Sequence, residues 1–76
     1  MTKHLYVLDF VSGSRYHTEF DVDDASKDYY SNIDEDEFKD MDINEKAVEV
    51  MDYYGLHVDG CEFMVTDKAL EEKELV

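Results

Sequence analysis

Residues 5–11, with the sequence LYVLDFV, limit the accessible folds more than any other part of the chain. In a strand, alternate side chains point to opposite faces, and here both sets are largely apolar. A strand that is apolar on both faces needs a neighbouring strand on each edge or cover on each face. We therefore expect this strand to lie at the centre of a small sheet.

Residues 4–22 predict a β-hairpin, because a second run with strand character, RYHTEFDV, follows a Gly-Ser pair at 13–14. A two-residue loop with glycine first favours a type II′ turn and sets the register. The pairs expected on the apolar face are Val11–Tyr16, Asp9–Thr18, Val7–Phe20 and Leu5–Val22. The second strand is apolar on one face only, so we expect it at an edge of the sheet.

Residues 44–54 give the clearest helical pattern. Ala47, Val50, Met51 and Tyr54 recur at the spacing of one helix face, and Gly55 follows where a left-handed residue would end the helix. Residues 60–66 alternate in polarity and predict a third strand. Together these segments predict an α+β fold, a single domain over 1–76. Its antiparallel sheet has the order 2-1-3 and packs against the amphipathic helix.

The acidic segment 23–43 gives weaker signals. Asp23 or Asp24 could cap a short helix through Tyr30. Asn32 and Glu35 have the spacing of a capping box for a further helical turn through Met41. A partly irregular, solvent-facing segment is the alternative. For residues 67–76 the pattern leaves open a short helix or a tail.

Negative charge is concentrated in the middle of the chain. The formal net charge is −14 over 76 residues, and residues 21–52 hold thirteen acids and three lysines, whereas residues 1–20 sum to zero. Solubility alone is served by a net charge of about 2–8 in a small domain. Such a surface repels nucleic acid and anionic membranes and attracts basic partners.

The acids predict a surface that mimics nucleic-acid phosphates. Acids three or four residues apart share one side of the helix at 44–54, opposite its apolar side, and further acids precede that helix. A tyrosine beside them would add an anchoring contact. The predicted partner-binding residues are Asp34, Glu35, Asp36, Glu37, Asp40, Asp42, Glu45, Glu49, Asp52 and Tyr53.

In charge and size the chain is similar to small acidic inhibitors that phages and mobile elements deploy, such as anti-CRISPR and anti-restriction proteins and uracil-DNA glycosylase inhibitors. That resemblance implies a basic nucleic-acid-binding protein as partner, such as a nuclease, with no direct binding to nucleic acid. The alternative is an acidic adaptor or regulatory subunit that binds a basic protein without displacing nucleic acid. A homodimer is compatible with either function.

We expect no enzymatic activity, cofactor or metal. Cys61 lies four residues after His57, but a nucleophile needs a base positioned by the fold, which spacing alone does not supply. A calcium loop starting at Asp34 fails because Phe38 and Lys39 occupy its fifth and sixth positions, which require an oxygen ligand and a glycine. The absence of a long apolar run or leader favours a cytoplasmic protein with no membrane contact.

Overall fold

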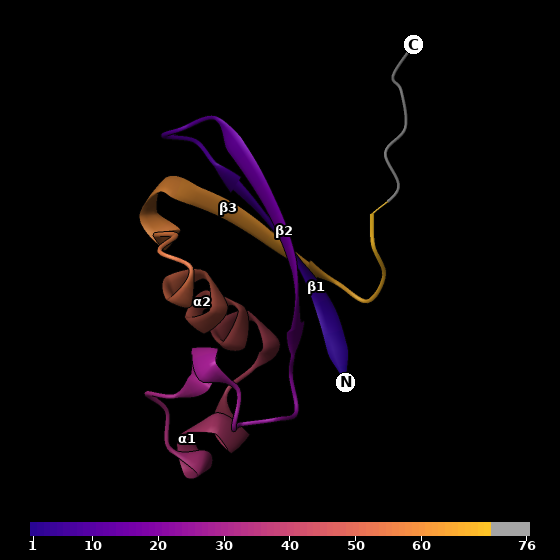
Figure 1. The fold of residues 1–76 in the computed structure, drawn as a ribbon, viewed down its shortest axis with the longest axis vertical. Helices are drawn as coiled ribbons and strands as arrows, with labels where there is room; N and C mark the ends of the chain where they lie inside the picture. The colour runs from indigo at the N-terminus through magenta and orange to yellow at the C-terminus, as the bar shows by residue number, and fades with distance from the viewer. Residues whose placement is uncertain (71–76) are drawn as a thin grey trace.

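The fold, taken from a computed structural model that describes residues 1–70, is a three-stranded sheet with helices on one face (Figure 1). The elements follow in the order β1 (Thr2–Asp9), β2 (Ser14–Asp21), the 3₁₀ turn η1 (Asp28–Tyr30), α1 (Glu35–Asp40), α2 (Ile43–Tyr53), the 3₁₀ turn η2 (Val58–Gly60) and β3 (Cys61–Thr66). The α+β class is therefore as predicted.

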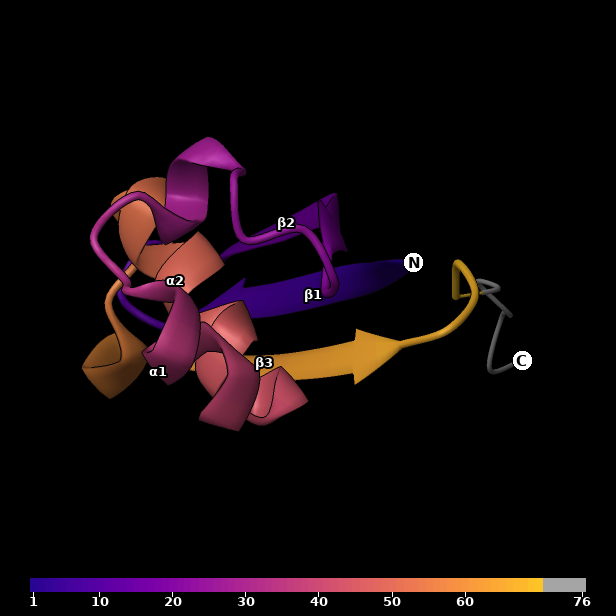
Figure 2. The same ribbon diagram turned by 90° about the horizontal axis from the view of Figure 1, so that it is seen from below.

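The sheet has the order β2-β1-β3, with both pairs antiparallel. Figure 2 shows β1 between the other two strands, so the prediction that the doubly apolar strand is central is confirmed. α1, α2 and η1 lie on one side of the sheet (Figure 1), and within residues 1–70 no helix covers the opposite side.

The predicted hairpin register is wrong. Leu5 pairs with Thr18 and Val7 with Tyr16, so every partner on β2 lies four residues earlier than expected. The strands are joined by a four-residue loop, residues 10–13, and not by a two-residue turn at 13–14. Because a shift of four is even, every side chain keeps its predicted face, and the apolar face is preserved.

Asp9 explains the longer loop. Its carboxylate accepts hydrogen bonds from the backbone N–H groups of Val11 at 2.9 Å and Ser12 at 3.3 Å, and its carbonyl accepts from Gly13 N–H at 2.8 Å. Gly13 ends the loop with φ +73°, a conformation that favours glycine. An aspartate that organises its own turn in this way outweighs the Gly-Ser signal.

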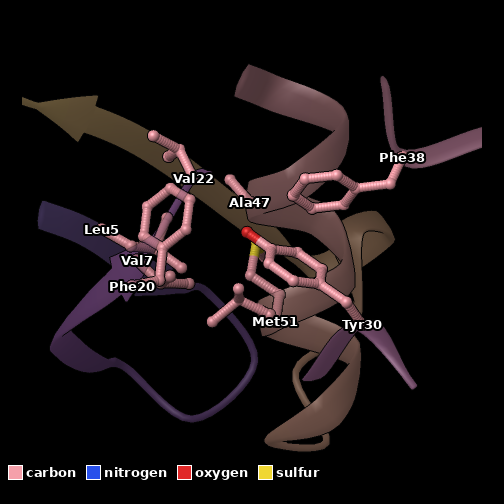
Figure 3. Packing of buried hydrophobic residues seen from close by; sticks show 9 residues of the cluster. Leu5, Val7, Phe20, Val22, Tyr30, Phe38, Ala47 and Met51 are labelled. Carbon is pink, nitrogen blue, oxygen red and sulfur yellow. The ribbon is translucent and has the colours of Figure 1, made fainter. Parts of the chain in front are cut away.

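The core forms between the sheet and the helices (Figure 3). Phe20, on the inner face of β2, is 1% exposed, and Ala47, Val50 and Met51 of α2 are fully buried. The other core residues are Leu5, Val7, Val22, Tyr30 and Phe38. Tyr30 donates its hydroxyl hydrogen to the Asp21 carbonyl at 2.5 Å. Burial raises the pKa of Tyr30, so this hydroxyl stays protonated and remains a donor.

Helix α2 has an identifiable cap at each end. The Asp42 carboxylate accepts from Glu45 N–H at 2.8 Å, as an N-cap residue does. At the other end Gly55 has φ +78°, and Leu56 N–H donates to the Met51 carbonyl at 2.8 Å, which completes a Schellman motif. Tyr54 is not part of the buried face, contrary to prediction; it is 56% exposed because it follows the last helical turn.

The segment between the hairpin and α2 differs in detail from the prediction. No helix starts at residue 23 or 24, because the Asp21 and Asp24 carboxylates hold this stretch in successive turns before η1. α1 begins after Asp34, so Asn32 is not its N-cap and the predicted capping box is wrong. Residues 67–70 are not helical, and the rest of the predicted C-terminal helix or tail lies outside the described residues.

Phe20→Ala should lower the free energy of unfolding by about 3–5 kcal/mol, because it removes a buried aromatic ring and leaves a cavity between β2 and α2. Urea unfolding monitored by circular dichroism measures the loss. Tyr16→Ala on the same strand is the control, since Tyr16 is 45% exposed. Equal losses for the two variants would contradict the core described here.

Asp21→Asn should reduce the acid sensitivity of the fold. The Asp21 carboxylate accepts from Asp23 N–H and Asp24 N–H, both at 2.7 Å, and these bonds lower the pKa of Asp21. A lowered pKa means that the folded state binds this proton less tightly than the unfolded chain. The stabilisation is therefore complete above about pH 4 and is lost as the pH falls through the folded-state pKa.

Urea unfolding at several pH values between about 2 and 7 tests this. The Asn variant should be less stable than wild type at neutral pH and should lose less stability on acidification. Asp28→Asn is the control, since Asp28 is exposed and its side chain has no hydrogen bond within residues 1–70. An Asp21 variant with the wild-type pH profile would contradict the assignment.

Candidate functional site

The candidate site is a groove of about 480 Å³ between α1 and α2. We call it the acidic groove. Four carboxylates belong to it, and the remaining side chains are apolar. Its lining residues are Ile33, Glu37, Asp40, Met41, Glu45, Val48 and Glu49. The groove therefore combines apolar surface with carboxylate groups in one concave place.

Burial of Phe38 positions α1 beside α2 and so creates the acidic groove. Phe38 is 6% exposed, and its ring lies edge-on to Tyr30 with 4.8 Å between ring centroids. Only two residues separate α1 from α2, so the first helix cannot move far from the second. With Phe38 turned inward, the remaining positions of this short acidic helix are left at the surface.

Lys46 is the basic residue of α2, and it does not neutralise the groove. Its ammonium donates to the Val22 carbonyl at 2.7 Å and lies 4.2 Å from the centroid of the Phe38 ring. Both contacting residues, Val22 and Phe38, belong to the buried core. Lys46 reduces the net negative charge of the sequence, but its ammonium group contacts the core. Within residues 1–70 it therefore forms no ion pair with the carboxylates on the outer side of the helix.

The structure brings together part of the predicted site. Glu37, Asp40, Glu45 and Glu49 line the acidic groove. Six predicted residues lie outside its lining. Of these, Asp34 and Asp42 precede the two helices as N-cap residues, Glu35 and Asp36 lie in the first turn of α1, and Asp52 and Tyr53 lie at the C-terminal end of α2.

Tyr53 belongs to a separate aromatic cluster. Its ring centroid lies 6.2 Å from that of Tyr29 and 5.1 Å from that of Tyr54. Tyr53 and Tyr54 are both more than half exposed. These rings form an accessible aromatic surface at the end of α2, but they do not line the acidic groove.

The carboxylates of the acidic groove lack charge partners. Within residues 1–70, the acids in ion pairs are Glu19, Asp21, Asp23 and Asp67, and none of them lies in the groove. The groove therefore carries a net negative field, which falls off over about 8–10 Å at physiological salt. A cation that enters it would meet several carboxylates without displacing an existing partner.

Ile33, Met41 and Val48 are the residues of the candidate site that the sequence-based prediction missed. They supply the apolar surface of the groove. Val48 offered a signal, because it is an apolar residue adjoining the acidic side of the helix in the sequence pattern. Lysine and arginine side chains have apolar stems and charged ends, so a surface of this composition suits them in both respects.

Other chemistry has little support in the described residues. Burial raises the pKa of the Cys61 thiol, which disfavours the reactive thiolate. No group of three or more His, Cys, Asp or Glu side chains within residues 1–70 is arranged to hold a metal ion. The helices found in that same range are too short and too polar to cross a bilayer.

Comparison of the chain with protein-family models, with curated proteins and with solved structures finds no match.

Added salt should raise the melting temperature by several degrees between about 0.02 M and about 0.3 M NaCl, because screening weakens repulsion among the carboxylates of α1 and α2. Differential scanning fluorimetry measures the shift. The groove variant Glu37→Gln/Asp40→Asn/Glu45→Gln/Glu49→Gln should show a smaller shift than wild type. A wild-type melting temperature that does not change with salt would contradict the prediction.

Proposed function

We propose that this protein is an acidic inhibitor that mimics nucleic-acid phosphates and blocks a basic nucleic-acid-binding protein, as phage counter-defence proteins do. The observation that carries the proposal is the acidic groove, in which four carboxylates without ion-pair partners in residues 1–70 surround apolar side chains. A surface intended only for solubility has no need of such a concave arrangement.

The spacing of the acids suits a phosphate-binding cleft. Glu45 and Glu49 are four residues apart on α2, which corresponds to about 6 Å along the helix axis. Phosphates on one strand of duplex DNA recur about every 3.4 Å along its axis, and both strands together give one charge per about 1.7 Å. Acids contributed by α1 as well as α2 bring the carboxylates closer to that density. A cleft lined with Lys and Arg could therefore bind them in place of phosphates.

The apolar part of the groove adds a contact that DNA does not make. A lysine or arginine that reaches the carboxylates can lay its methylene groups on Met41 and Val48. Charge alone gives fast but unselective association, whereas apolar contacts slow dissociation. This combination suits an inhibitor that must compete with a polyanion, and it also suits the alternative function of an acidic adaptor.

Competition with DNA distinguishes the inhibitor from the adaptor. The assay measures displacement of a fluorescent duplex from purified bacterial DNA-binding enzymes: a restriction nuclease, an RNA-guided nuclease and a uracil-DNA glycosylase. Wild-type protein should displace the duplex from at least one of them at micromolar concentration. The groove variant defined above should need at least about tenfold more protein, because it lacks the groups that engage the enzyme's basic side chains.

The matched control, Asp23→Asn/Asp28→Asn/Asp59→Asn/Glu62→Gln, loses the same formal charge at exposed positions outside the groove. It should inhibit nearly as well as wild type. Equal weakening by the two variants would show that total charge, and not the acidic groove, determines binding. Binding to an enzyme that keeps its duplex would favour the adaptor, and failure to bind any of the three would count against the proposal for these enzyme classes.

A further inference from the structure

The outer edge of β2 exposes backbone groups that can pair with another strand. Asp21 shows which residues face outward, because its N–H donates to the Tyr29 hydroxyl at 2.7 Å and its carbonyl accepts from the Tyr30 hydroxyl at 2.5 Å. Both groups therefore point away from β1. In an antiparallel strand this orientation recurs at every second residue, so the backbone groups of Arg15, His17 and Glu19 point outward as well.

Two features limit the length of this edge. The tyrosine hydroxyls occupy the Asp21 backbone at one end, and the hairpin loop at 10–13 ends the strand at the other. The stretch that remains, residues 14–20, has His17 at its centre. By the same alternation, the His17 backbone groups point away from Tyr6, its partner on β1. The His17 ring stacks on Tyr6, 4.4 Å between centroids, so it lies over the sheet and does not cover the edge.

The edge is self-complementary in charge. When two antiparallel copies of β2 are centred on His17, Arg15 of each copy lies opposite Glu19 of the other. Opposite charges at facing positions stabilise a strand pair, and like charges there destabilise it. We propose that two copies of this chain pair through β2, with a two-fold axis at His17, to form a continuous six-stranded antiparallel sheet.

The inner side of the edge borders an open groove. This groove, of about 530 Å³, lies between strands β1 and β2 and the end of α2, and Tyr16, Thr18 and Tyr54 are among its lining residues. In the centred register Tyr16 of each copy faces Thr18 of the other, an aromatic and β-branched pair of the kind that stabilises sheets. No proline interrupts the strand, and proline is a common protection of exposed edges.

Repulsion between the two acidic halves does not prevent this pairing. The stretch that pairs, residues 14–20, lies in the first twenty residues, whose formal charges sum to zero. The order β2-β1-β3 places β3, a strand that α2 contacts, farthest from the junction. With strands about 4.8 Å apart, the two β3 strands would lie roughly 24 Å from each other, about three times the Debye length at 0.15 M salt.

The outer edge of β3 is a less suitable partner for its own copy. If two β3 strands were centred on Phe63, Glu62 of each copy would face Met64 of the other, so the register would gain no charge pair. The β2 edge is therefore the one that selects a register. This inference does not depend on the proposed function, because neither the acidic groove nor an external partner takes part in the pairing.

Exchanging the two charges tests the dimer. Sedimentation equilibrium at about 0.15 M NaCl should show a concentration-dependent dimer for wild type. Arg15→Glu creates two Glu–Glu contacts and Glu19→Arg two Arg–Arg contacts, so either variant alone should dimerise at least about tenfold more weakly. The double variant Arg15→Glu/Glu19→Arg, and an equimolar mixture of the two single variants, should dimerise within about threefold of wild type.

Circular dichroism establishes that each variant is folded. His17→Pro supplies a second measurement, because it removes an outward-facing N–H without removing a bond to β1 and should also give a monomer. A monomeric wild-type protein at all accessible concentrations would overturn the proposal. So would single variants that dimerise like wild type, which would place the contact on another surface such as the β3 edge.

Discussion

The burial of Tyr30 and Phe38 holds the acidic half of the chain against the sheet. Residues 21–52 carry most of the net charge, and like charges at this density oppose a compact state. The two rings are almost fully buried and pack edge to face, and the Tyr30 hydroxyl is hydrogen-bonded to the last residue of β2. The position of α1, and with it the shape of the acidic groove, depends on these aromatic contacts.

Because of this constraint, the nearly neutral hairpin and the acidic helices have different roles in the fold. The hairpin is nearly neutral in charge and supplies one wall of the core, while the helices supply the other wall with their inner faces and carry acids on their outer faces. Lys46 shows how complete this separation is, since the basic residue of α2 is turned toward Phe38 and the Val22 carbonyl. The molecule thus has a strongly acidic side and a weakly charged sheet.

The sequence predicted what depends on periodicity and missed what depends on particular side-chain contacts. Strand and helix periodicity gave the fold class, the central strand and the buried face of α2. The hairpin register failed because the Asp9 carboxylate organises a longer loop than the Gly-Ser pair suggests. For the candidate site, composition identified the acids, but which of them meet depends on how Phe38 packs. No local pattern contains that information.

The same charges have opposite consequences in the free protein and in the complex that we propose. In the free protein the carboxylates of the acidic groove have no ion-pair partners in the described residues, so their mutual repulsion lowers the stability of the fold. A basic cleft that bound the groove would relieve this repulsion and add its own attraction. The free energy that repulsion costs the free protein would therefore contribute to the affinity of the complex. Proteins commonly retain such destabilising arrangements where function needs them. A merely solubilising surface would gain nothing from concentrating its charge, whereas a phosphate mimic requires that concentration, and the aromatic core under α1 makes it tolerable.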